Sequence, residues 1–118
     1  IPNKVSLSDT RKGIEMINKL KIPILGLVEN MSWYTPLGST KKHYVFGKDG
    51  GVKLATEYNL DLLAQIPLVD TKDDDFLIDN AILSTIFNSL ASEVVDKSKN
   101  IDGKYQNLIP QVNLKTDA

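Results

Sequence analysis

The sequence predicts an α/β fold that forms part of a doubly wound parallel sheet, because strand-like and helix-like segments alternate along the chain. Two short apolar runs, 24–28 and 60–66, have the length of strands that are buried on both faces of such a sheet. Three segments with apolar residues at helical spacing surround them, at 6–20, 51–58 and 80–97. The predicted order is therefore helix, strand, excursion, helix, strand, helix.

The first helix has a polar start and one apolar stripe. Ser6 or Ser8 can cap it, which places Asp9 in its first turn, where a carboxylate suits the helix dipole. Its apolar positions recur every three residues, at Ile14, Ile17 and Leu20. Gly13 costs about 1 kcal/mol relative to alanine, which indicates either close packing or a tolerated defect.

The segment 31–46 is irregular and contains a turn signal, formed by Pro36, Gly38 and Ser39. Aromatic residues flank the turn on both sides, so we expect a β-hairpin or another ordered excursion above the sheet. A glycine cluster at 47–51 then opens the second helix. Its spacing fits neither common phosphate-loop pattern, which favours a tight loop leading into a helix.

The last helix has a strong amphipathic pattern that predicts one wide buried face. This face comprises Ile82, Leu83, Ile86, Phe87, Leu90, Ala91, Val94 and Val95. The acidic segment 69–79 lacks the glycine and the distal glutamate of an EF-hand, so a solvated loop is a better interpretation than a metal site. Residues 99–118 are polar and are expected to form a flexible tail.

Composition limits the possible functions. The chain has 118 residues, enough for one domain, and its net charge of −1 gives no electrostatic reason to bind nucleic acid. No apolar run reaches the length of about 18 residues that a membrane span needs. Cysteine is absent, which removes disulfides and thiolate chemistry and favours a cytoplasmic setting. Two strands make a poor sheet and the chain starts without Met, so we expect a fragment of something longer.

Polar side chains follow the first strand directly, at Glu29, Asn30 and Ser32. In open α/β sheets, ligands bind beyond the carboxyl ends of the strands. These three side chains are therefore candidates for contacting a ligand.

Four segments of the chain, in register, resemble the Mrp family of iron–sulfur cluster carrier ATPases, in the MinD/ParA branch of P-loop NTPases. Residues 2–13 (PNKVSLSDTRKG) resemble its TPQ-x-VAL-x-D-x-RKG segment, and residues 22–32 (IPILGLVENMS) resemble its VPVLGVVENMS. Residues 46–51 resemble its FGxGG, and residues 65–68 its xIPL. The resemblance implies that residues 1–98 are the C-terminal half of a P-loop ATPase domain.

The resemblance also implies an ATP-binding role for particular residues. Asn30 matches the asparagine that recognises adenine in the family, and Ile66, Pro67 and Leu68 match a segment that borders the base. An amide can both donate to and accept from a purine edge. The alternative for Asn30 is a capping or turn residue, and Glu29 is better explained as structural. We predict no catalytic residue, because the chain contains no Walker A motif and should not hydrolyse Mg-ATP alone.

The chain departs from the family where the metal is expected. The family carries Cys-x-x-Cys in the excursion, and the aligned positions here are Pro36 and Ser39, with His43 as the only histidine. We therefore expect no metal ligands and no cluster binding by the usual route. The family further implies a homodimer, with Trp33 and Tyr34 lining either the dimer contact or their own domain, and apo iron–sulfur proteins as partners.

Two other functions stay open. The protein could be a MinD/ParA-type nucleotide switch without a metal role, which the missing cysteines favour. It could also be a non-enzymatic remnant that binds partners through the excursion and the last helix.

Overall fold

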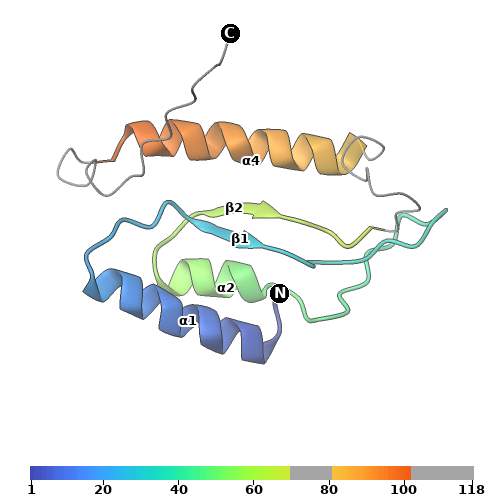
Figure 1. The fold of residues 1–118 in the computed structure, drawn as a ribbon. Helices are drawn as coiled ribbons and strands as arrows, with labels where there is room; N and C mark the ends of the chain where they lie inside the picture. The colour runs from blue at the N-terminus through green and yellow to red at the C-terminus, as the bar shows by residue number, and fades with distance from the viewer. Residues whose placement is uncertain (70–80, 102–118) are drawn as a thin grey trace, which may run out of the picture.

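The computed structural model describes residues 1–69 and 81–101, which form a parallel two-stranded sheet between helices (Figure 1). The elements are α1 (Lys4–Lys19), β1 (Leu27–Glu29), α2 (Gly50–Glu57), β2 (Leu62–Gln65) and α4 (Ala81–Lys99). Helices α1 and α2 cover one side of the sheet and α4 covers the other (Figure 1). This arrangement confirms the predicted α/β fold. The acidic segment, from residue 70 on, and the tail, from residue 102 on, lie outside the described residues.

Strands β1 and β2 pair in parallel, with Leu27 opposite Leu62 and Glu29 opposite Gln65. The ladder is irregular between Leu27 and Val28. Both strands are shorter than the apolar runs that predicted them, and β1 begins at Leu27 rather than at residue 24. The reason is that half-buried side chains continue upstream of the hydrogen-bonded ladder, so the apolar run marks burial rather than pairing.

The expectation that β1 is buried on both faces is wrong. Val28 is 45% exposed, whereas Glu29, which points to the opposite face, is buried. Helix α4 packs against β2, and α2 packs against β1. The α4 side of β1 therefore has no helix over it among the described residues.

Helix α1 starts earlier than predicted, at Lys4, because Asn3 caps it. The Oδ1 atom of Asn3 accepts a hydrogen bond of 2.8 Å from the Ser6 backbone N–H. Neither predicted serine is the cap, and Asp9 falls outside the first turn. Asparagine is at least as good a cap as serine, and here it comes first in the chain.

The apolar stripe of α1 is only partly buried. Ile14 is buried, Ile17 is half-buried and Leu20 is 63% exposed. A Cβ atom at Gly13 would meet nothing within 4 Å. Gly13 is therefore a tolerated defect, and close packing does not explain it.

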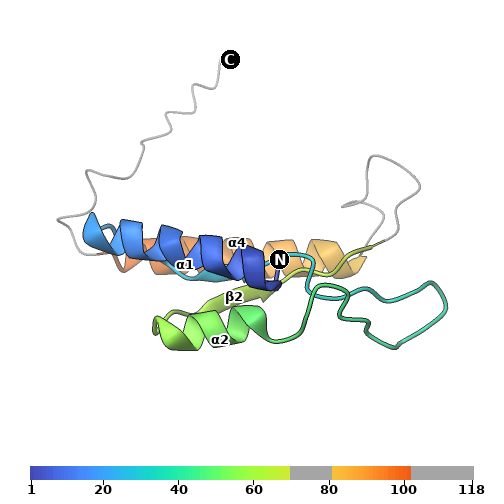
Figure 2. The ribbon, with the colours of Figure 1, turned by 90° about the horizontal axis from the view of Figure 1, so that it is seen from below.

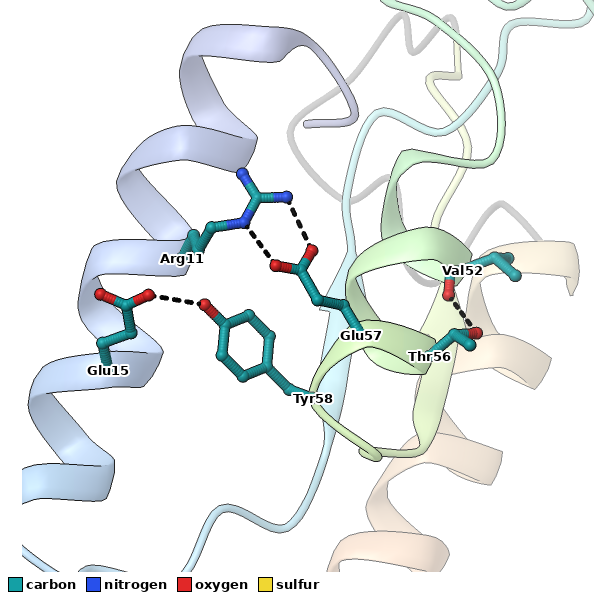
Figure 3. Close-up of polar contacts among 6 residues, drawn as sticks. All are labelled: Arg11, Glu15, Val52, Thr56, Glu57 and Tyr58. Carbon is teal, nitrogen blue, oxygen red and sulfur yellow. Dashed lines mark hydrogen bonds and ion pairs between the residues drawn. The ribbon is translucent and has the colours of Figure 1, made fainter.

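Two polar contacts join α1 to the end of α2 (Figure 3). Arg11 donates to both carboxylate oxygens of Glu57, from Nε at 3.0 Å and from Nη2 at 2.8 Å. The Tyr58 hydroxyl donates to Glu15 at 3.0 Å. The hydrogen bond from Arg11 lowers the pKa of Glu57. Partial removal from water raises the pKa of Tyr58, and the hydrogen bond to Glu15 raises it further. These contacts link α1 to α2 at the surface of the layer that the two helices form.

Helix α4 buries less of its apolar face than predicted. Leu83 is buried and Leu90 is half-buried, but Ile82 is 65% exposed and Val95 is 52% exposed. A sheet of two strands is too narrow to cover so wide a face. An ion pair between Lys97 and Asp61 ties the end of α4 to the residue before β2. Within the described ranges, no helix combines the length and apolar character that crossing a membrane requires.

We predict that Gly13→Ala stabilises the chain by about 0.5–1 kcal/mol, because alanine restricts the unfolded chain and favours the helix. The free energy of unfolding can be measured by urea denaturation followed by circular dichroism. Gly26→Ala is the contrasting variant and should lower the free energy of unfolding. Its Cβ would lie 2.6 Å from Leu63 Cγ and 2.7 Å from the Asp61 carbonyl oxygen. A loss of stability in Gly13→Ala would contradict the open environment of this position.

We predict that Glu57→Gln lowers the melting temperature slightly at neutral pH and not at all in acid. The native pKa of Glu57 lies below its ordinary value of 4.5, so its ion pair stabilises the fold above pH 4.5. That contribution is lost as the pH falls below 4.5 through the lowered native pKa. The effect is small because the pair is exposed. Thermal melts from neutral to acidic pH test this, with Glu93→Gln on α4 as the control, and a pH-independent difference would contradict it.

Candidate functional site

The candidate site lies at the carboxyl ends of β1 and β2, where the two chain segments continue side by side beyond the strands. The Ile66 N–H donates to the Glu29 carbonyl at 2.8 Å, and the Ser32 N–H donates to the Ile66 carbonyl at 2.9 Å. The Leu68 N–H then donates to the Trp33 carbonyl at 2.7 Å. The structure therefore places the predicted Asn30 and Ile66–Leu68 on adjacent segments at one end of the sheet.

Glu29 is a buried carboxylate that joins three elements. It is 5% exposed, and its Oε2 atom accepts a hydrogen bond of 2.6 Å from the Gly51 N–H at the start of α2. Its Oε1 atom accepts from Gln65 Nε2, on β2, at 3.3 Å. A carboxylate at a helix N-terminus also interacts favourably with the helix dipole. The structure thus gives Glu29 a structural role, as expected, and not a role in contacting a ligand.

Asn30 is exposed and follows the last residue of β1. Its Oδ1 atom accepts a hydrogen bond of 2.8 Å from the N–H of Met31, a residue with a positive φ of 55°. In the described ranges, no acceptor pairs with its Nδ2 group. The oxygen of Asn30 thus supports a local turn, while the amino group is available to an acceptor such as a purine ring nitrogen.

The segment 66–68 offers mainly backbone and one half-buried side chain. Ile66 and Pro67 are buried, and Leu68 is half-buried. Pro67 and Leu68 line an open hollow of about 470 Å³ together with residues of the excursion, whereas Asn30 and Ile66 do not line it. The four predicted residues thus lie near one another, but only two of them line this hollow.

The excursion projects beyond the end of the sheet (Figure 2). Tyr34 and His43 close it through two backbone hydrogen bonds, of 2.8 and 2.7 Å, in an antiparallel bridge. At its tip the Ser39 N–H donates to the Pro36 carbonyl at 3.0 Å, and Gly38 has a φ of +79°. These contacts confirm the predicted turn and the ordered, hairpin-like excursion.

The glycine cluster is a tight loop that enters α2, as expected. Gly47 has a φ of +110°, which favours glycine, and Gly50 and Gly51 are buried. A Cβ atom at Gly51 would lie 2.5 Å from Glu29 Oε2, and one at Gly50 would lie 2.8 Å from the Pro2 carbonyl oxygen. The glycines therefore permit close packing, and the first turn of α2 faces the protein's own carboxylate.

Metal-binding side chains do not gather within the described ranges: no group of three or more His, Cys, Asp or Glu residues there could hold an ion. Pro36 and Ser39 occupy the tip of the excursion, and neither supplies a thiolate. The donor set in this part of the chain does not fit an iron–sulfur cluster.

The fold and the strand-end geometry define an α/β protein with a parallel sheet between helices. A family model described as ParA, NUBPL iron-transfer P-loop NTPase, matches residues 1–102. The chain therefore belongs to this family.

Curated relatives agree with this assignment. The chain is 45% identical over 67 residues to an iron–sulfur cluster carrier protein of Pseudomonas fragi, covering 57% of the chain and 23% of that protein. It is 43% identical over 67 residues to the iron–sulfur cluster transfer protein NUBPL of Mus musculus, covering 57% and 21%. A carrier protein of Pyrococcus horikoshii is 34% identical over 110 residues, covering 86% and 37%. The chain thus spans well under half the length of these relatives.

A solved structure shares the fold. A nucleotide-binding protein of Archaeoglobus fulgidus, in complex with ADP and with Co, superposes with a TM-score of 0.50 at 19% identity. The match covers 95% of this chain and 39% of that one. At this identity the likeness supports the fold alone.

Two partners that organise the site were not predicted from the sequence, Gly51 as the donor to Glu29 and Gln65 as the second donor. The signal was present, since a carboxylate ends one strand, an amide ends the other and a glycine pair opens the helix. Spacing alone does not reveal that these residues meet, because 22 positions separate Glu29 from Gly51.

We predict that Glu29→Ala destabilises the chain by about 1–3 kcal/mol, because it leaves the buried Gly51 N–H without its acceptor. Glu29→Gln should cost less, because its amide oxygen can still accept from Gly51. Urea denaturation measures both variants, and Glu93→Ala on the surface of α4 is the control. Equal stability of Glu29→Ala and the wild type would contradict the structural role of this carboxylate.

Proposed function

We propose that this chain forms the adenine-binding side of an ATP site in a protein that carries or transfers iron–sulfur clusters. The observation that carries the proposal is the exposed amide of Asn30, held at the carboxyl end of β1 beside the segment 66–68. Ligands of open α/β sheets bind at this position. Family membership and the iron–sulfur relatives support the proposal.

The phosphate side of the proposed site needs groups that this sequence does not contain. No G-x-x-x-x-G-K-[ST] pattern occurs in the chain, and the N–H of Gly51 donates to Glu29. We therefore assign no catalytic residue here and propose that ATP hydrolysis with Mg²⁺ depends on residues outside this chain. When bound, Mg²⁺ would neutralise phosphate charge during that reaction.

The proposed cargo and partners are an iron–sulfur cluster, a second copy of the protein and apo iron–sulfur proteins. The absence of cysteine is the specific observation that favours the competing function, a metal-free nucleotide switch of the MinD/ParA type. The cytoplasmic setting stays a prediction, and the related protein of Arabidopsis thaliana is named as mitochondrial.

We predict that adenosine perturbs the amide resonances of Asn30, Met31 and 66–68 in the chain more than guanosine does. Asn30→Asp should reduce the preference for adenosine about three- to tenfold, the range for loss of one hydrogen bond. Two-dimensional NMR titrations measure both effects, with the exposed Asn18→Asp on α1 as the control. Perturbations centred elsewhere, or an unchanged preference in Asn30→Asp, would contradict the base-binding role.

The cargo is tested by anaerobic reconstitution with iron and sulfide. We predict that the wild-type chain retains no cluster, whereas the double variant Pro36→Cys/Ser39→Cys gains one, measured by iron content and visible absorbance. A Pro36→Ala/Ser39→Ala variant controls for changes in the loop. A wild-type cluster would contradict the ligand analysis, and failure of the cysteine variant would favour the metal-free switch.

A further inference from the structure

The segment around the excursion has a charge balance unlike that of the whole chain. Residues 30–48 contain three lysines and one histidine and no acidic residue, although the net charge of the chain is −1. The acidic residues that flank this segment are Glu29, which is buried against Gly51, and Asp49, which precedes α2. The excursion is therefore a basic surface.

Within this basic surface lies an apolar hollow of about 470 Å³. Its apolar lining includes Trp33, Pro36, Leu37, Pro67, Leu68 and Ile82. Lys42 also lines the hollow, with its Nζ atom 3.9 Å from the centroid of the Trp33 ring. This cation–π contact holds a positive charge at an apolar wall.

Apolar side chains around the hollow are unusually open to solvent. Leu37 is 93% exposed and Ile82 is 65% exposed, and Val45 in the same excursion is 62% exposed. Leu37 and Ile82 both line the hollow, and exposed apolar side chains grouped beside polar ones are typical of an interaction site. A hollow of this volume can accept a bulky side chain of a partner protein, whereas the flat surface of a membrane would not enter it.

We propose that this hollow binds an acidic segment of a partner protein, which inserts an apolar side chain beside Trp33 and places carboxylates near Lys41 and Lys42. The complementarity is of two kinds, apolar at the centre and electrostatic at the rim. The proposal does not depend on the proposed function, because it requires neither nucleotide nor cluster.

Trp33 is the only tryptophan, so its fluorescence reports directly on the hollow. The probe is a synthetic peptide with a central Leu-Phe pair between glutamates, and the control peptides replace either the Leu-Phe pair with alanines or the glutamates with glutamines. We expect a saturable change in Trp33 emission with the acidic apolar peptide, weakened by added salt. Both control peptides should bind several-fold more weakly.

Charge reversal tests the rim. Lys41→Glu/Lys42→Glu should weaken peptide binding about tenfold or more, because each exposed charge that is reversed turns an attraction into a repulsion. The matched control is Lys53→Glu on the exposed surface of α2, which should change binding less than twofold. Circular dichroism of all variants confirms that they fold, so a loss of binding can be assigned to charge.

Other occupants would overturn the proposal, each with its own result. Binding to phosphatidylglycerol vesicles but not to the peptide would make the surface a membrane contact. Self-association that is abolished by Lys41→Glu/Lys42→Glu, without peptide binding, would assign the surface to a second copy. Peptide binding that is absent in the wild type and gained only when Asp73, Asp74 and Asp75 are replaced with serine would make the chain's own acidic segment the occupant. Equal binding of all three peptides would remove the proposed specificity.

Discussion

The hydrogen bond between the Glu29 carboxylate and the Gly51 N–H is the interaction on which the described structure depends most. It joins the end of β1 to the start of α2, and Gln65 extends the same contact to β2. The carboxylate is buried, so its hydrogen bonds are what make its burial tolerable. The contact also explains Gly51, because a side chain there would occupy the space of the carboxylate oxygen.

This contact divides the strand end into an inner and an outer part. Glu29 points into the protein, and the next residue, Asn30, is exposed at the carboxyl end of the sheet. Ser32 is buried, and its hydroxyl donates to the Glu29 carbonyl at 3.0 Å, which stabilises the chain as it leaves the strand. The excursion then projects beyond the sheet (Figure 2). It carries exposed lysines and lines the apolar hollow. Glu29 therefore acts in two ways, through its carboxylate on α2 and β2 and through its backbone carbonyl on the segment that leaves the strand.

The sequence predicted the elements well where local pattern decides them. The α2 and α4 segments and the turn at Gly38 depend on apolar periodicity and turn chemistry, and these are local. The predicted start of α1 was wrong, because both asparagine and serine can cap a helix and Asn3 precedes the serines. The predicted burial of Val28 and of the α4 face was also wrong. Burial depends on which elements pack against each other, and the apolar pattern alone does not encode this.

For the site, sequence reasoning identified the strand end and the adjacent segment 66–68, because parallel strands bring their carboxyl ends together. It did not identify the partners of Glu29 or the hollow beside Trp33. The hollow combines residues from the excursion, from the segment after β2 and from α4, which are far apart in the sequence. The adenine-binding role of Asn30 stays a prediction that rests on its position and on the family.

Amide hydrogen exchange at Gly51 tests the central claim most directly, because it reports on the donor to Glu29. The account predicts that the Gly51 N–H, although it lies in the first turn of α2 where backbone amides lack helical partners, exchanges as slowly as amides in the middle of that helix. Its proton resonance should also lie downfield, as a short hydrogen bond to a carboxylate requires. Exchange at the rate of an exposed first-turn amide would contradict the claim that Glu29 holds α2 against the sheet.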